Sequence, residues 1–207
     1  MTDENPKRPY RMCRRAEAQD ETRRRITESA VVLHGSVGPA RTSVSAVAEH
    51  AGVRRSTVYR HFPDEAALFE ACAAHWAAAN PAPDLAGWAQ IAAPAARLAI
   101  ALPELYAFYA RTEPMLTNLF RDELTVPLVE HRFAEFRAYL AAAGETLMTG
   151  RELRAPARRR TRAAIGHAVA FSTWKSLVRE QGLAQPQAVA LMCALVAAAG
   201  QAGAAAG

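Results

Sequence analysis

Apolar residues recur at helical spacing in the stretch from residue 43 to residue 62. Four of them lie at i, i+3, i+4 and i+7, the spacing of one buried stripe on a helix: Val44, Val47, Ala48 and Ala51. Gly52 follows at once, and glycine readily adopts the left-handed backbone that ends a helix in a sharp turn. A second helix is predicted up to Phe62, because Pro63 cannot continue it. The pattern therefore predicts two short helices joined by a tight turn.

The second of these helices has two unlike faces. Val58 and Phe62 are four residues apart and can face a core together. The other positions carry cations, hydroxyl groups and a phenol: Arg54, Arg55, Ser56, Thr57, Tyr59 and Arg60. Such groups suit phosphate oxygens and base edges, so the pattern indicates a helix-turn-helix whose second helix enters a DNA major groove. An ordinary helical hairpin with a solvated face is the alternative interpretation.

The rest of the chain also shows helical periodicity, and no alternating run of β-branched residues competes with it. We predict an all-α fold in which an N-terminal three-helix, helix-turn-helix domain precedes a further α-helical domain. The predicted parts are a flexible basic arm at residues 1–19, the helix-turn-helix domain with a connecting helix at 20–79, and the α-helical domain at 80–207. Within the last part, Pro103 predicts a kink or break, and Pro114 opens a short separate helix.

The net positive charge of the chain favours a polyanionic partner such as DNA, but it is not sufficient evidence for one. The 207 residues include 25 lysines and arginines and 20 aspartates and glutamates, which gives a formal net charge of +5. The N-terminal arm is dense in arginine: Arg8, Arg11, Arg14 and Arg15. Two interpretations of the arm remain open. It touches phosphates or a minor groove, or it is a solvated tail.

The cysteines and the hydropathy of the chain bear on metal sites, disulfides and the cellular compartment. The three cysteines lie far apart and form no CxxC or Cys/His cluster, so neither a zinc site nor a disulfide framework is expected. A reducing cytoplasm is the simplest compartment. The polar N-terminus lacks the apolar segment of a secretory signal, and no apolar run is long and strong enough to span a membrane. We therefore expect a cytoplasmic protein without a membrane partner.

The stretch RTSVSAVAEHAGVRRSTVYRHFPDEAALFEA resembles the DNA-binding signature of TetR-type transcriptional regulators. The resemblance covers about Arg25 to Ala71 and rests on residues in a fixed order: Thr42, Ser43, Ala48, Ala51, Gly52, Val53, Thr57, Tyr59, His61, Phe62 and Leu68. It implies a homodimeric, repressor-like protein that binds a palindromic operator in double-stranded DNA. An effector bound in the C-terminal domain would then alter the spacing of the two N-terminal heads and release the operator.

The resemblance also implies roles for individual residues. Three positions match base-facing places on the recognition helix: Arg55, Ser56 and Arg60. Five match phosphate contacts, the tyrosine among them sometimes touching a base: Thr42, Ser43, Thr57, Tyr59 and His61. Arg54 stands where a serine often caps the recognition helix, so the cap is weaker while the added charge favours phosphate. Glu65 stands where a lysine is frequent, and no DNA contact is expected there.

Large aromatic and thioether side chains recur at helical spacing in the C-terminal half. As a set they could enclose an apolar cavity for a small effector, while plain core packing is the alternative for each of them. The candidates are Tyr106, Tyr109, Met115, Phe120, Phe133, Phe136, Phe171 and Trp174. His167 is a candidate polar group of the same cavity, with a structural histidine as the alternative.

Small residues crowd the last two predicted helices, at about residues 158–181 and 185–199. Small side chains let helices approach one another closely. The family resemblance implies that the homodimer forms here, as a four-helix bundle to which each subunit contributes these two helices.

No constellation of residues indicates catalysis. The chain has no Ser/His/acid set in a known motif, no glycine-rich phosphate loop and no HExxH, so we expect no catalytic residue, no metal site and no cofactor. Two alternatives to an effector-controlled regulator remain. One is a nonspecific architectural DNA-binding protein, which would show steep salt dependence and little sequence preference. The other is a helical enzyme or carrier that uses the C-terminal cavity.

Overall fold

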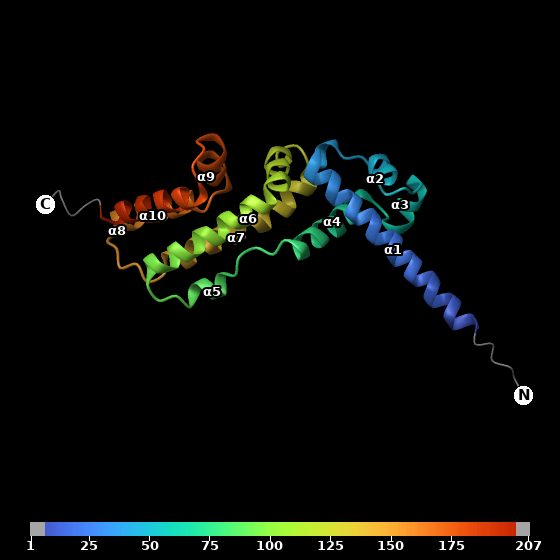
Figure 1. The fold of residues 1–207 in the computed structure, drawn as a ribbon, viewed down its shortest axis with the longest axis horizontal. Helices are drawn as coiled ribbons and strands as arrows, with labels where there is room; N and C mark the ends of the chain where they lie inside the picture. The colour runs from blue at the N-terminus through green and yellow to red at the C-terminus, as the bar shows by residue number, and fades with distance from the viewer. Residues whose placement is uncertain (1–6, 202–207) are drawn as a thin grey trace, which may run out of the picture. The chain divides into compact units, whose positions relative to one another are not determined.

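The structure, a computed structural model that describes residues 7–201, consists of helices joined by turns (Figure 1). No strand occurs in this range, which confirms the predicted all-α fold, and no helix in it is both long and apolar enough to cross a membrane. A 3-10 turn at Pro39–Arg41 and a π-helical turn at Ser176–Glu180 accompany the α-helices. The α-helices are α1 (Lys7–Ser36), α2 (Val44–His50), α3 (Arg55–His61), α4 (Glu65–Ala79), α5 (Leu85–Ala89), α6 (Pro94–Asp122), α7 (Pro127–Met148), α8 (Ala155–Ala168), α9 (Phe171–Lys175) and α10 (Gln185–Gln201).

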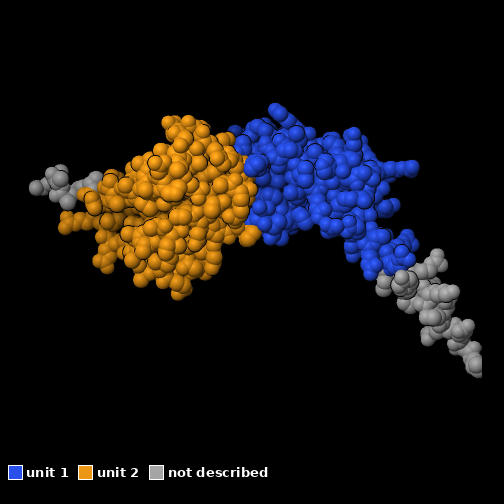
Figure 2. Space-filling model, in the orientation of Figure 1, with its two compact units in different colours: residues 1–80, 114–130 blue, residues 81–113, 131–207 orange. Residues whose placement is uncertain are grey.

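The chain divides into two compact units (Figure 2). Unit 1 contains the described residues up to 80 together with 114–130, and unit 2 contains residues 81–113 and those from 131 onward. The sequence places segment 114–130 in the C-terminal domain, whereas the structure places it in unit 1. The reason is a set of hydrogen bonds from the C-terminal end of α6 to the backbone that follows α1.

Helices α1 to α4 bury the apolar stripes that the sequence predicts. Gly52 has a φ of +63°, so the predicted left-handed turn between α2 and α3 is confirmed. The Ser43 hydroxyl accepts from the backbone N–H of Ala46 at 3.1 Å as the N-cap of α2. Asp64 caps α4 in the same way. The core of unit 1 draws on all four helices: Ile26, Ala30, Val44, Val47, Ala48, Ala51, Val58, Phe62, Leu68 and Cys72.

The first helix begins earlier than predicted. Residues 7–19, expected as part of a flexible arm, form the first turns of α1, and residues 1–6 lie outside the described range. The segment contains four arginines and two alanines, together with single lysine, methionine, glutamate and glutamine residues, all of which favour helix. Farther along the same helix, Arg24 pairs with Glu21 and Glu28 at 2.8 and 2.7 Å, one helical turn away on either side. Helix propensity therefore outweighs the repulsion among the arginines.

Helix α6 runs without a break from Pro94 to Asp122, through both prolines that the sequence marks as interruptions. The helix therefore does not break at Pro103, and the prediction of a separate helix opened by Pro114 is wrong. A proline inside a helix removes one backbone hydrogen bond. Burial on the same helix outweighs this loss, because α6 contributes several large buried side chains: Leu102, Leu105, Tyr106, Tyr109 and Leu116.

Unit 2 is built around aromatic side chains of α6 and α9. Tyr106 and Tyr109 on α6 are fully buried. The ring centroid of Tyr109 lies 5.4 Å from that of Phe171 and 6.0 Å from that of Trp174. Such edge-to-face and tilted contacts add to the stabilisation that comes from burying the rings. Helices α8 and α10 pack together in the same unit.

The long helix predicted at residues 158–181 is interrupted. Helix α8 ends at Ala168, and α9 begins only at Phe171. The hydroxyls of Tyr106 and Tyr109 donate to the backbone carbonyl oxygens of Ala168 and Val169 at this interruption. These two buried donors stabilise carbonyl groups that a continuous helix would have used internally. The donors are about 60 residues away in the chain, so no local pattern predicts the interruption.

His34, near the end of α1, is buried in the core of unit 1 with 8% of its surface exposed. Its Nδ1 lies 3.3 Å from the Sγ of Cys72 on α4, and its ring centroid lies 5.6 Å from that of Phe69. Burial lowers the pKa of His34 to about 4, and the carboxylate of Asp122 opposes this shift only in part. The imidazole is therefore neutral at neutral pH.

The free energy of unfolding of unit 1 should fall as the pH drops from 6.5 to about 4. The unfolded chain binds more protons than the folded chain across this window, because His34 titrates at its ordinary pKa only when it is exposed. The expected loss is about 3 kcal/mol, measured by urea unfolding at a series of pH values. His34→Leu should remove the part of this pH dependence that His34 causes, leaving the part from His61, whose pKa is also lowered, and the matched change at the exposed His75, His75→Leu, should keep the whole of it. Equal slopes in wild type and His34→Leu would contradict the prediction.

Candidate nucleic-acid interface

Two apolar anchors orient α3. Val58 and Phe62 are buried in the core of unit 1 together with residues of α1, α2 and α4. A helix repeats every 3.6 residues, so the positions opposite Val58 face outward. Thr57 and His61 are half-buried. The other predicted DNA-binding residues at the start of α3 and along it are exposed: Arg54, Arg55, Ser56, Tyr59 and Arg60.

The exposed face of α3 carries an arginine that is already held in place. Nη2 of Arg55 donates to the hydroxyl of Tyr59 at 3.1 Å, and its guanidinium carbon lies 5.5 Å from the centroid of the Tyr59 ring. The contact restricts the rotamers of Arg55 in the free protein, which lowers the entropy lost on binding. A guanidinium presented in this way has the fork of donors that pairs with O6 and N7 of a guanine.

Thr42 and Ser43 lie where the chain enters α2. The Ser43 hydroxyl accepts from a backbone amide as the helix cap, so its own hydrogen remains available for a phosphate oxygen. The Thr42 hydroxyl donates to the carbonyl oxygen of Gly38 at 2.8 Å and so faces its own turn. The geometry therefore suits a phosphate contact through Ser43 better than one through Thr42.

Arg54 and His61 flank α3 at its two ends. Arg54 occupies the N-cap and makes no side-chain cap bond, as expected of a group that cannot accept a hydrogen bond. Nε2 of His61 is buried without a hydrogen-bond partner among residues 7–201. Burial lowers the pKa of His61, and the charges of Arg60 and Arg23 lower it further. The ring is therefore neutral at neutral pH and can offer a phosphate a hydrogen bond rather than a charge.

Sequence reasoning missed one residue that positions α3. Nη1 of Arg23, on α1, donates to the carbonyl oxygen of His61, and its guanidinium carbon lies 4.1 Å from the centroid of the Phe62 ring. The last carbonyl groups of a helix have no partner within the helix and carry partial negative charge. Arg23 therefore caps α3 at its C-terminal end. The partners are 38 residues apart, and a run of three arginines ahead of the buried stripe of α1 was the only signal.

The family model for bacterial regulatory proteins of the tetR family matches residues 26–72, which contain α2, α3, the last part of α1 and the first part of α4. The DNA-binding domain of this chain is a TetR-family domain. The resemblance carried by residues 42 to 68 is thereby confirmed. Within this TetR-family domain, α3 is the second helix of the helix-turn-helix, the position that a recognition helix has in this motif.

Solved structures extend the likeness to most of the chain. A putative TetR-family transcriptional regulator from Mesorhizobium loti MAFF303099 is 18% identical, with a TM-score of 0.59 over 87% of this chain and 96% of that one. A tetR-family transcriptional regulator from Streptomyces coelicolor is 21% identical, with a TM-score of 0.55 over 87% and 79%. A putative fatty acid metabolism regulator from Clostridium perfringens is 13% identical, with a TM-score of 0.61 over 83% and 96%. No curated protein matches the chain. The likeness shows that the chain has the fold of a TetR-family transcriptional regulator.

The predicted effector residues of this chain are divided between the two units. Met115 and Phe120 belong to unit 1, where Met115 is buried and Phe120 is exposed. His167 is exposed in unit 2, with Nδ1 3.1 Å from Oγ1 of Thr173. Ring contacts that pass through Phe108 connect the remaining candidates in unit 2: Tyr106, Tyr109, Phe133, Phe136, Phe171 and Trp174.

Trp174 carries an unusual donor within this aromatic group. Its side chain is fully buried, and its Nε1–H has no hydrogen-bond partner within the described part of the chain. A buried indole N–H usually finds an acceptor, since leaving it without one costs free energy. The position is therefore one at which an acceptor atom would be bound favourably.

Arg23→Gln should loosen the last turn of α3 in the free protein. The change removes the cation that caps this turn and stacks on Phe62, so the backbone amide of Phe62 should exchange with solvent about fivefold faster. Hydrogen exchange followed by NMR measures this rate. Arg24→Gln is the matched control, because the Arg24 guanidinium pairs with glutamates of its own helix. If the Phe62 amide exchanged equally fast in the two variants, Arg23 would not cap α3.

Proposed function

We propose that this chain is a transcriptional repressor that binds a palindromic operator as a homodimer and is released by a small apolar effector bound in unit 2. The exposed face of α3, with Arg55 held by Tyr59 among other cations and hydroxyls, carries the proposal. The proposal includes no catalytic step, cofactor or metal. Among residues 7–201, no three His, Cys, Asp or Glu side chains are grouped so that they could hold a metal ion.

Arg55 and Arg60 are the proposed base readers, with Ser56 beside them on the same exposed face. An arginine paired bidentately with a guanine edge contributes about 1–3 kcal/mol of discrimination against other bases. Contacts to phosphates set the register of α3 in the groove without reading the sequence. The residues proposed for these contacts are Thr42, Ser43, Arg54, Thr57, Tyr59 and His61.

The homodimer is proposed to form through α8 and α10. On α10, Leu191 and Leu195 are 46% and 41% exposed and lie one turn apart. Four small residues of the same helix are exposed beside them: Ala190, Ala194, Ala197 and Ala198. Because α8 packs against α10, the two helices offer a surface that a second copy can complete as a four-helix bundle. Apolar stripes of this kind on a helix pair are typical of protein–protein contacts.

The effector is proposed to bind against the aromatic group of unit 2. The hydroxyls of Tyr106 and Tyr109 already donate to the backbone, whereas the Nε1–H of Trp174 has no partner in the range described. An apolar molecule that carries one hydrogen-bond acceptor would fit such surroundings, because apolar walls and a few placed polar groups are typical of ligand sites. This is the effector class that the buried donor supports.

Footprinting on the DNA that flanks the gene of this protein, over a series of salt concentrations, tests the proposal. We expect two protected half-sites whose centres lie about 34 Å apart or a multiple of this distance, since a dimer presents two recognition helices to one face of DNA. Protection should survive moderate salt. Diffuse protection that disappears as salt rises would instead identify the nonspecific architectural protein. A screen for small molecules that release the operator follows from a specific footprint.

Tyr59→Ala and Arg60→Ala should each weaken operator binding about tenfold or more, because each removes a group proposed to touch DNA. Both variants should remain dimeric, since neither residue lies on α8 or α10. Fluorescence anisotropy gives the affinities, and sedimentation gives the oligomeric state. Arg132→Ala is the matched control, because its guanidinium pairs with Glu135 on α7. Wild-type affinity in either α3 variant would exclude α3 as the recognition helix.

Leu191→Glu combined with Leu195→Glu should convert the dimer to a monomer. Carboxylates placed in an apolar interface lose hydration without gaining partners. Operator affinity should fall about 100-fold, because the second half-site no longer benefits from the first. Leu124→Glu is the control, since Leu124 is 93% exposed and lies in unit 1. Sedimentation velocity distinguishes the two species, and a double variant that stayed dimeric would rule out this interface.

A further inference from the structure

The turn between α1 and α2 leads directly to the residues proposed to contact phosphates. The amides of Val37 and Gly38 donate back to the last turn of α1, and the 3-10 turn Pro39–Arg41 follows. The Thr42 hydroxyl donates to the carbonyl oxygen of Gly38 at 2.8 Å. The conformation of this turn therefore sets where Thr42 and Ser43 stand.

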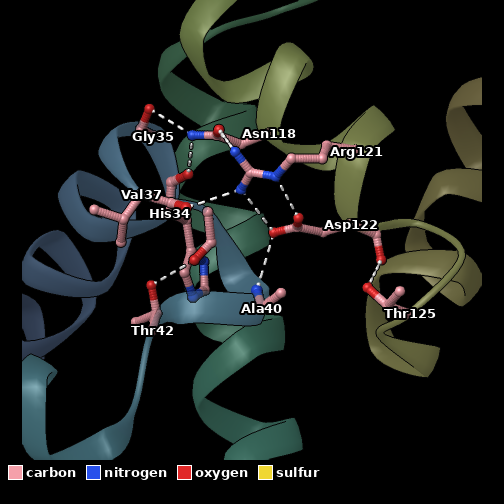
Figure 3. A network of polar contacts seen from close by, with 10 residues as sticks. His34, Gly35, Val37, Ala40, Thr42, Asn118, Arg121, Asp122 and Thr125 are labelled. Atoms are coloured by element: carbon pink, nitrogen blue, oxygen red, sulfur yellow. Dashed lines mark hydrogen bonds and ion pairs between the residues drawn. The ribbon is translucent and has the colours of Figure 1, made fainter.

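Asn118, on the last part of α6, caps the end of α1 (Figure 3). Its Nδ2 donates to the carbonyl oxygen of His34 at 2.9 Å and to that of Gly35 at 2.8 Å. Such carbonyl groups at a helix end have no partner within the helix. Its Oδ1 accepts from Nη1 of Arg121 at 2.9 Å, so both ends of the amide are used.

Arg121 and Asp122 bind the turn itself (Figure 3). Nη2 of Arg121 donates to the carbonyl oxygen of Val37 at 2.8 Å, and its Nε pairs with Oδ1 of Asp122 at 2.8 Å. Oδ2 of Asp122 accepts from the backbone N–H of Ala40 at 3.0 Å. Arg121 and Asp122 therefore hold one carbonyl group and one amide on the two sides of Gly38.

Gly38 shows how closely the turn approaches these two side chains. Its φ is +94°, a conformation that side-chain-bearing residues rarely adopt. A Cβ at this position would collide with the guanidinium of Arg121 and the carboxylate of Asp122. The turn and the two side chains are therefore fitted to one another.

The carboxylate of Asp122 is ionised although only 3% of the residue is exposed. Burial opposes the charge, but hydrogen bonds from Arg121 and from the amide of Ala40, with the charges of Arg121 and Arg41, outweigh it and lower the pKa of Asp122. The charge therefore strengthens the bond to the turn at neutral pH.

We propose that Asn118, Arg121 and Asp122, together called the clasp, are positioning residues for operator binding: they hold the turn that sets where Thr42 and Ser43 stand, so that the Ser43 hydroxyl meets a DNA phosphate. The inference rests on the proposed function, because it needs those phosphate contacts. It adds to that function a cluster of residues that touch no DNA and still set operator affinity. The bonds of the clasp span 82 to 84 residues of sequence.

Asp122→Asn tests the clasp. The change keeps the size of the side chain but removes the ion pair with Arg121, and it should weaken operator binding about tenfold. The salt dependence of binding should stay unchanged, because the contacts that the clasp positions are neutral hydroxyl groups. Glu113→Gln is the matched control. Glu113 lies on α6 like Asp122, and the change removes its ion pair with Arg179, in which the charged atoms are 2.7 Å apart. Its operator affinity should equal that of wild type.

A double-mutant cycle separates positioning from a general loss of stability. The second background is Thr42→Val with Ser43→Gly, which lacks both hydroxyls while glycine keeps most of the N-cap stability. If the clasp acts through these hydroxyls, Asp122→Asn should weaken binding about twofold or less in that background. Full additivity of the losses would overturn the proposal, as would a folded Asp122→Asn chain that binds like wild type.

Arg121 supplies a second variant that should fold. Its side chain is 43% exposed, so Arg121→Gln should keep the fold, weaken operator binding in the same direction, and be rescued in part by Arg121→Lys. Thermal melting followed by circular dichroism establishes that each chain is folded at the assay temperature. A wild-type chain without sequence-specific binding would overturn the proposed function and the clasp together. Specific wild-type binding that neither Arg121→Gln nor Asp122→Asn changed would overturn the clasp alone.

Discussion

A helix of seven residues has almost no stability of its own, and the proposed DNA-facing surface of this protein lies on such a helix. Helix α3 exists because Val58 and Phe62 are buried against the other helices of unit 1. Arg23 adds a cap at its C-terminal end, while Arg54 at its N-cap adds no side-chain bond. The burial of two apolar side chains therefore decides where the cations and hydroxyls of α3 point. Caps and neighbouring turns refine that orientation but do not create it.

The parts of the fold that the sequence predicted are those with local causes. The stripe of α2, the left-handed turn at Gly52 and the cap at Asp64 each depend on residues within about one helical turn. The contacts that position the site, from Arg23 to His61 and from Asp122 to the turn before α2, join residues 38 and 82 apart. No periodicity links such partners. Helix α6 shows the opposite case. A local rule predicts that proline interrupts a helix, but α6 is continuous because burial of its side chains outweighs the lost hydrogen bonds.

Net charge is a weak guide to the proposed DNA surface of this protein, because its arginines have different roles. Arg55 is exposed on α3, whereas Arg23 and Arg121 donate hydrogen bonds to backbone carbonyl groups of unit 1. In unit 2, Arg97 is 3% exposed and all of its assigned acceptors are backbone carbonyl oxygens: Ile91, Ala92, Thr146 and Thr149. A guanidinium has five donors in a fixed fork, so it can bind backbone carbonyl groups of several chain segments at once. The interleaving of arginine with hydroxyls on one helix face is therefore the more specific signal for DNA.

Helix α6 gives the proposed effector control a physical basis. Its residues 94–113 belong to unit 2 and include Tyr106 and Tyr109, while its residues 114–122 belong to unit 1 and include the clasp. Under the proposed function, an effector packed against Tyr106 and Tyr109 would contact the same helix whose last turns carry the clasp. The effector can change the operator affinity only by the ratio of its own affinities for the two arrangements of α6. An effector that binds one arrangement about 100-fold more tightly can therefore lower the operator affinity by at most about 100-fold.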